Sequence, residues 1–175
     1  MKRTTILAAL ALAAATALVA AAGAGGKPPK GSPKLSATPV FKLNLRPSQE
    51  VPAIKGLRAD AVGSVTFDLE RTGNTITSGE VIFYFNYAFP GSVTITGLHI
   101  HQGAKGTNGP IVVDSGVGTF TDADGQGNVT AIVSGVAGPT LQAILDNPRG
   151  YYVNLHTSAN PGGALRDQLH NPKKR

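Results

Sequence analysis

The sequence predicts an all-β protein, an antiparallel β-sandwich or barrel with one short helix. Three observations lead there. Apolar and polar residues alternate in short segments, as in Phe41-Lys42-Leu43-Asn44-Leu45, a two-residue period typical of half-buried strands. Turn signals separate these segments, and the 175 residues include 22 glycines and 12 prolines. Many short strands at this spacing favour a sandwich or a barrel.

Eight strands are expected along the chain. In order they cover residues 41–45, 65–69, 80–87, 93–101, 109–113, 128–133, 151–156 and 164–169. Turns are expected at 71–74, 89–91, 124–127 and 160–163. One segment breaks the pattern, because Leu141, Ile144 and Leu145 follow a helical spacing, with Pro139 before them and Asn147-Pro148 after. A short helix over 139–146 should therefore close one end of the sandwich or barrel.

The N-terminus has the features of an export signal. Met1-Lys2-Arg3 is a short basic start, an apolar run follows over 6–19, and Ala20-Ala21-Ala22 suits signal peptidase. We expect a signal peptide over 1–22, a flexible linker over 23–39, a folded domain over 40–169 and a basic tail over 170–175. A membrane anchor is the alternative, but the run is shorter and richer in alanine than a spanning helix requires. The expected location is secreted, periplasmic or in the cell envelope, with no transmembrane segment after signal cleavage.

The formal charge of +6 belongs to the ends of the chain. Segment 40–169 carries eight basic side chains and all ten acidic ones, a net charge of −2. No basic stripe with interleaved aromatic residues is visible, so nucleic acid is not an expected partner. The chain has no cysteine, which excludes disulfides and thiol chemistry.

Three of the four histidines lie in two expected strands. Alternate residues of a strand share a face, so His99 and His101 point away from Leu98 and Ile100. By the same rule Asn154 and His156 point away from Val153 and Leu155. If the two strands are neighbours, three imidazoles converge, and copper or zinc binds such nitrogens. In the alternative interpretation, the histidines bond to the backbone and to Arg166, bracing glycine-rich loops.

Four segments together resemble the CHRD domain, the module repeated in chordin and found alone in exported bacterial proteins. They are Glu50-Val51-Pro52, the segment from Gly97-Leu98-His99-Ile100-His101-Gln102-Gly103 to Val112, Tyr152-Val153-Asn154-Leu155-His156-Thr157, and Pro161-Gly162-Gly163-Ala164-Leu165-Arg166. The resemblance covers about 41–169 and implies an immunoglobulin-like sandwich or barrel. In chordin it implies extracellular binding of growth factors, whereas for a lone bacterial copy it implies no partner and no activity.

Leu98-His99-Ile100-His101 and the following glycine-rich loop are also similar to the copper-binding strand of Cu/Zn superoxide dismutases, which are Greek-key barrels. That likeness implies copper ligation by His99, His101 and His156, with Arg166 attracting the anionic substrate. The sequence departs from the pattern, because it has no zinc-binding histidines after His101 and no disulfide cysteines, and because His170 lies beyond the last strand.

These observations predict a polar cluster in which Glu50, Asn154 and Arg166 surround the histidines and join the opening segment to the last strand. The expected function is a non-catalytic binding or structural role outside the cytoplasm, with an unidentified extracellular or envelope partner and no catalytic residue. The competing hypothesis is a copper- or zinc-dependent redox protein that uses the three histidines.

Overall fold

The computed structural model describes residues 38–174. The expected signal peptide and almost all of the expected linker lie outside these residues. The elements are β1 (Pro39–Leu45), η1 (Pro47–Gln49), β2 (Asp60–Thr72), β3 (Thr75–Ala88), β4 (Val93–Gln102), β5 (Ile111–Asp114), β6 (Phe120–Asp122), β7 (Gln126–Ala137), α1 (Gly138–Asp146), η2 (Pro148–Gly150), β8 (Tyr151–Thr157), β9 (Asn160–Gln168) and β10 (Lys173–Lys174).

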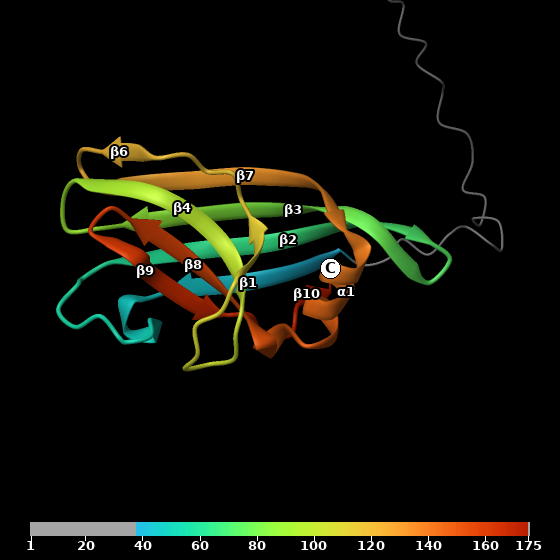
Figure 1. The fold of residues 1–175 in the computed structure, drawn as a ribbon. Coiled ribbons are helices and arrows are strands. Elements are labelled where there is room, and N and C mark those ends of the chain that lie inside the picture. Colours follow the sequence, from blue (N-terminus) through green and yellow to red (C-terminus); the bar gives the residue numbers. More distant parts are fainter. Residues whose placement is uncertain (1–37, 175) are drawn as a thin grey trace, which may run out of the picture. The chain divides into compact units, whose positions relative to one another are not determined.

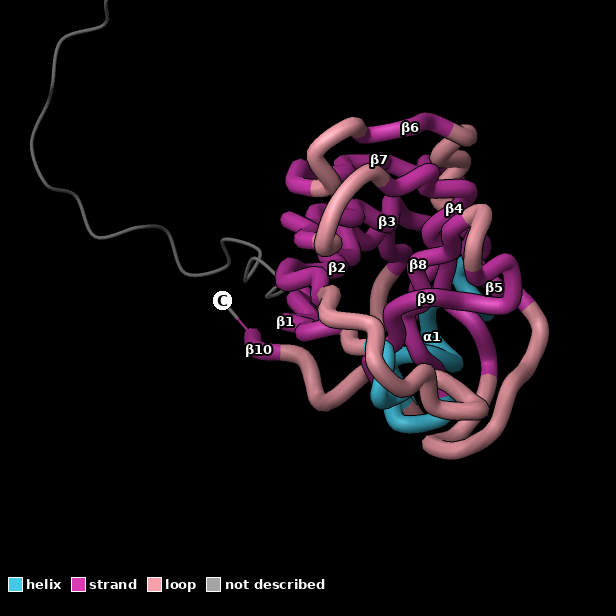
Figure 2. The backbone as a smooth tube through the Cα atoms, turned by 90° about the vertical axis from the view of Figure 1, so that its left-hand side faces the viewer, coloured by secondary structure: helices cyan, strands magenta, loops and turns pink. Residues whose placement is uncertain are grey.

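The strands form two antiparallel sheets that pack face to face (Figure 1). The first has the order β10-β1-β2-β3-β7, and the second has the order β5-β4-β8-β9, with β6 also paired to β4. Figure 2 shows β1, β2, β3 and β7 on one side and β4, β8 and β9 on the other. Of the two architectures predicted from the sequence, the structure has the sandwich and not a closed barrel.

The alternating patterns identified in the sequence build the core between the sheets. In β1, Phe41, Leu43 and Leu45 are buried while Lys42 is exposed. Phe83 and Phe85 of β3 face the same core, which the second sheet completes with Leu98, Ile100, Val153, Leu155 and Leu165. Burial of these apolar side chains is the main stabilising contribution to such a sandwich.

The predicted helix is confirmed as α1. Leu141 and Ile144 have no exposed surface, so the apolar face of the helix completes the core at one end of the sandwich. The helix packs closely on β3, because a Cβ atom at Gly79 would lie 2.9 Å from Leu141 Cδ1. None of the helices in the described part of the chain is long and apolar enough to cross a membrane.

Three details differ from the expected pattern. The turn expected at 160–163 is wrong, because the hairpin turns at Ser158–Ala159 and β9 starts at Asn160, which pairs with Thr157. A two-residue loop suits adjacent antiparallel strands. Because β9 begins at Asn160, before the expected strand 164–169, it pairs with β8 from the turn onward. The short strands β6 and β10 were not predicted; β10, which lies in the expected basic tail, pairs with Pro39 and Val40.

Strand β8 is buried over its whole length, on both of its faces. Val153 and Leu155 face the core, and the opposite face carries polar side chains under a covering loop. We call this loop, residues 103–110 between β4 and β5, the clasp loop. The backbone amide of Gly103 donates to Gly150 O at 2.7 Å, and the side-chain amide of Asn108 donates from Nδ2 to Val51 O at 2.7 Å.

Candidate metal centre

The three histidines meet because β4 and β8 are antiparallel neighbours in one register. Gly97 lies opposite His156, His99 opposite Asn154, and His101 opposite Tyr152. The pairing places the histidine side chains on the outer face of the second sheet. Each ring offers one nitrogen such that the three nitrogens lie within 4.8 Å of one another. Side-chain alternation places the histidines of each strand on one face, and the register between β4 and β8 brings the two strands' histidines together.

Each imidazole has one nitrogen next to an oxygen acceptor. His101 Nδ1 lies 3.0 Å from Gly109 O, and His156 Nδ1 lies 2.9 Å from Pro161 O. His99 Nε2 lies 3.4 Å from Asp114 Oδ1. Carbonyl and carboxylate oxygens accept hydrogen bonds, so these contacts favour a proton on each of the three nitrogens. Such outer partners are what metal-ligating histidines have in proteins.

The other nitrogen of each ring then carries a lone pair. His99 Nδ1 is buried and has no hydrogen-bond partner. His101 Nε2 and His156 Nε2 face each other at 3.3 Å. A hydrogen bond between those two atoms needs a proton on one of them, which makes that ring a cation if its contact with the carbonyl is kept.

The surroundings of His101 disfavour a cation at that ring. The pKa of His101 is lowered to about 4, chiefly by burial, with the neighbouring histidines and Arg166 adding to the effect against the bond to Gly109 O. Burial is also the main cause that lowers the pKa of His99, with His156 contributing and Asp114 opposing. Protonation of His99 and His101 is therefore disfavoured, and one nitrogen from each of the three rings lies within 4.8 Å of the others.

The donor set fits a zinc or copper ion. Zinc–nitrogen bonds of about 2.0–2.1 Å in a tetrahedron place neighbouring nitrogens about 3.3–3.4 Å apart. The His101–His156 separation of 3.3 Å equals one such edge. The His99 ring has to approach the other two, and its Nδ1 has no existing bond to lose. Imidazole nitrogen is a ligand that suits both metals.

Two glycines give the rings and their neighbours room. A Cβ atom at Gly97 would lie 2.7 Å from His99 Cε1, so only glycine lets that ring lie against β4. Gly163 has φ +128° and lies against the side chain of Asn154, where any side chain would be both strained and obstructed. These glycines explain why glycine-rich segments accompany the histidines in the sequence.

Arg166 holds the clasp loop over the site. Its guanidinium donates to Thr107 O at 2.9 Å, Asn108 Oδ1 at 3.1 Å and Ala104 O at 3.2 Å. Its Cζ lies 3.4 Å from the centre of the Tyr152 ring, against which His101 also stacks. The guanidinium is buried and bonded to the loop, whereas the dismutase likeness implies an arginine that attracts an anion.

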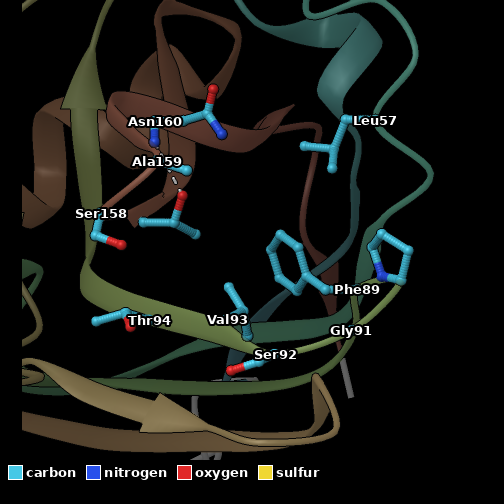
Figure 3. Close-up of a pocket in the computed structure, with 11 residues that line it drawn as sticks. Leu57, Phe89, Gly91, Ser92, Val93, Thr94, Ser158, Ala159 and Asn160 are labelled. Atoms are coloured by element: carbon cyan, nitrogen blue, oxygen red, sulfur yellow. Dashed lines mark hydrogen bonds between the residues drawn. The ribbon is translucent and has the colours of Figure 1, made fainter.

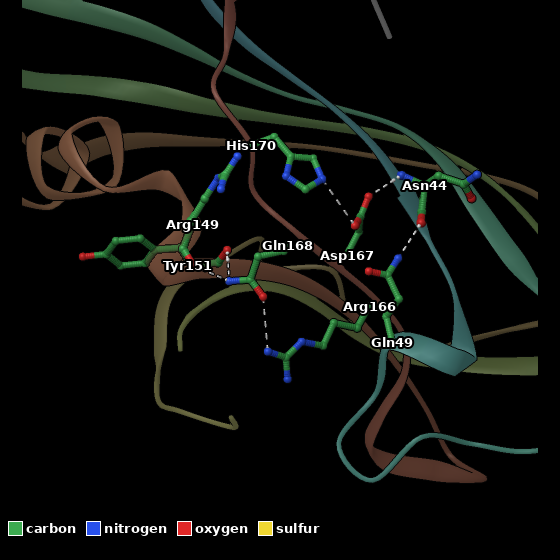
Figure 4. Close-up of polar contacts among 8 residues, drawn as sticks. All are labelled: Asn44, Gln49, Arg149, Tyr151, Arg166, Asp167, Gln168 and His170. Atoms are coloured by element: carbon green, nitrogen blue, oxygen red, sulfur yellow. Dashed lines mark hydrogen bonds and ion pairs between the residues drawn. The ribbon is translucent and has the colours of Figure 1, made fainter. Parts of the chain in front are cut away.

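Gln168 anchors the base of the clasp loop. Its side-chain amide donates to Gly103 O at 2.7 Å, Tyr151 O at 2.8 Å and Arg149 O at 2.9 Å. Figure 4 shows Gln168 beside Arg166, and Asp167 pointing away toward Asn44 and His170. His170 Nε2 lies 3.9 Å from Asp167 Oδ1, so the fourth histidine is not in the cluster.

Glu50 and Asn154 complete the polar surroundings. Asn154 Nδ2 lies 3.4 Å from Glu50 Oε2, while Glu50 Oε1 and Asn154 Oδ1 are buried without a partner. Burial raises the pKa of Glu50 to about 7, against the attraction of Arg166 and the bond from Asn154. The opening segment also bonds to β9 through the backbone, since the Arg46 amide donates to Arg166 O at 2.9 Å. The structure thus brings together all six residues singled out in the sequence.

Sequence reasoning did not identify Asp114, Tyr152 or Gln168 as part of the site. Tyr152 was detectable, because it shares a face with Asn154 and His156 by the same alternation. Asp114 was not, because its place opposite His99 depends on the irregular pairing of β4 with β5. The role of Gln168 depends on the course of the clasp loop.

A separate pocket of about 380 Å³ lies at one end of the sandwich (Figure 3). Its walls are the β3–β4 loop, the β8–β9 turn and Leu57, with Phe89 and Asn160 among its lining residues. All the lining side chains are uncharged, and none belongs to the histidine cluster. The cluster is therefore the stronger candidate for a chemical function.

Comparison with known proteins gives one result. No curated protein and no solved structure matches the chain. The model of the CHRD domain family matches residues 41–169, which include all of β2 to β9 and every residue of the candidate centre. The chain therefore belongs to the CHRD domain family.

Proposed function

We propose that this CHRD-domain protein is exported and binds a zinc or copper ion outside the cytoplasm through His99, His101 and His156. One observation carries the proposal: each of the three rings has an oxygen partner at one nitrogen and none at the other. One nitrogen from each ring lies within 4.8 Å of the other two, and burial lowers the pKa of both His99 and His101. A divalent metal satisfies all three lone pairs at once.

The metal experiment starts with protein from its native compartment. Elemental analysis should find about one zinc or copper ion per chain, and the metal-free protein should take up one equivalent on titration. The variant His99→Ala should lose this uptake. His170→Ala is the matched control, because it removes a histidine that is exposed and outside the cluster. Metal-free native protein that also fails to take up Zn²⁺ or Cu²⁺ would falsify the proposal.

A second candidate role, bracing of the fold, has its own supporting observation. The Nδ1 contacts of His101 and His156 hold the carbonyls of two loop segments, at Gly109 and Pro161. The variant His101→Gln distinguishes the two roles. If the histidines only brace the fold, His101→Gln lowers the melting temperature equally with and without added metal. If they bind metal, the wild type gains stability with added Zn²⁺ and the variant gains much less.

Export has separate support and a separate test. The basic start, the apolar run and the small residues at 20–22 match a cleavable signal. N-terminal sequencing of protein from the medium or the cell envelope should find a chain that starts close to Gly23. Recovery of the chain only from the cytoplasm, starting at Met1, would contradict export and leave the metal proposal standing.

A further inference from the structure

We infer that the metal centre leaves one coordination position open toward solvent, and that this position accepts water or a small monoanion. The inference rests on the metal binding proposed above. It concerns the ligand of the bound metal, which the three histidines alone do not specify.

The first step is the number of protein ligands. Among residues 38–174, the histidine cluster that could hold a metal contains His99, His101 and His156 and no fourth histidine, cysteine or carboxylate. A tetrahedral ion with three protein ligands takes its fourth ligand from solvent. The separation of 3.3 Å between His101 Nε2 and His156 Nε2 equals one edge of such a tetrahedron.

The second step is the direction of access. The rings of His101 and His156 are covered by the segments whose carbonyls they contact, and both residues are buried. The side chain of His99 is 14% exposed, and its partner Asp114 is 65% exposed. His99 is therefore the least buried of the three histidines, and we place the open position on its side of the cluster, next to Asp114.

The third step is charge and size. Three neutral imidazoles leave the full charge of a divalent ion. Within residues 38–174, the one carboxylate that contacts a ligand ring is that of Asp114. The net positive charge favours an anion over a neutral ligand. The clasp loop is fixed by Arg166 and Gln168 over the neighbouring part of the face, which favours a ligand of a few atoms.

The test uses azide and protein loaded with one equivalent of Cu²⁺. Titration with azide should produce a saturable charge-transfer absorption band and a changed electron paramagnetic resonance spectrum, with one azide per copper and no loss of metal. If copper is bound stoichiometrically but azide leaves the spectrum unchanged or removes the copper, the inference is overturned and the metal proposal stands. If copper does not bind, both are overturned.

A charge variant tests the electrostatic part of the inference. Asp114→Asn keeps a side-chain oxygen that can accept from His99 Nε2 and removes one negative charge beside the open position. At copper saturation its azide affinity should rise by roughly threefold to tenfold, from the loss of one unit of repulsion near the surface. His170→Ala is the matched control and should bind azide like the wild type. An affinity that falls in Asp114→Asn would overturn the assignment of the open position beside His99.

Discussion

Replacing Glu50 by Gln should remove a pH dependence from the stability of the domain. Glu50 is 7% exposed, one of its oxygens has no partner, and no ion pair joins it to Arg166 in the described part of the chain. Its pKa of about 7 in the folded protein, against an ordinary value of 4.5, means that the folded state binds a proton more tightly than the unfolded state does. The contribution of Glu50 to the free energy of unfolding is therefore fully present below pH 4.5 and is lost as the pH rises through 7.

The size of the effect follows from the pKa. Each pKa unit corresponds to about 1.36 kcal/mol, so the shift of Glu50 is worth at most about 3 kcal/mol in the free energy of unfolding. His99 and His101 act in the opposite direction, because their lowered pKa values make stability rise with pH. Their contribution is present in both proteins, so the difference between wild type and Glu50→Gln isolates the carboxyl group.

The assay is urea unfolding of both proteins between pH 4.5 and 8, with EDTA present so that bound metal does not contribute. Relative to Glu50→Gln, the wild type should become less stable as the pH rises, by between about 1 and 3 kcal/mol over this range. The control Glu70→Gln removes an exposed carboxylate of β2, and its curve should run parallel to that of the wild type. Parallel curves for Glu50→Gln and wild type would refute the reasoning.

Three further substitutions have defined outcomes. Gly97→Ala should displace the ring of His99 and lower zinc affinity at least about tenfold. The control Gly118→Ala places a Cβ atom in open space and should leave zinc affinity unchanged. Equal zinc affinities for the two variants would contradict the role of Gly97. Arg166→Gln should speed amide hydrogen exchange in the clasp loop and lower zinc affinity by about 10–100-fold. Unchanged hydrogen exchange in this variant would show that Arg166 does not hold the loop. Leu141→Ala should cost about 2–5 kcal/mol in urea unfolding, and a smaller loss would mean that α1 contributes little to the core.

Local patterns predicted much of the fold. Strand alternation depends only on neighbouring residues, so it placed β1, β4 and β8 correctly and assigned the histidines to the polar face of their strands. The helical spacing of Leu141 and Ile144 identified α1 in the same way. The prediction was wrong at Asn160, where glycine and proline indicated a turn but pairing with β8 continues the strand. A turn signal describes the local preference of the backbone, and the neighbouring strand overrides it.

The sequence by itself determined most of the strands, the helix, the CHRD resemblance and the side of each histidine-bearing strand on which the polar residues lie. Only the tertiary structure decided that β4 and β8 are neighbours and that their register brings His99, His101 and His156 together. It also decided that the clasp loop lies against Tyr152 and Arg166. The physical reason is range: side-chain alternation is set within a few residues, whereas the two strands are about 50 residues apart in the chain. The same packing places Arg166, a member of the predicted polar cluster, where its guanidinium holds the clasp loop.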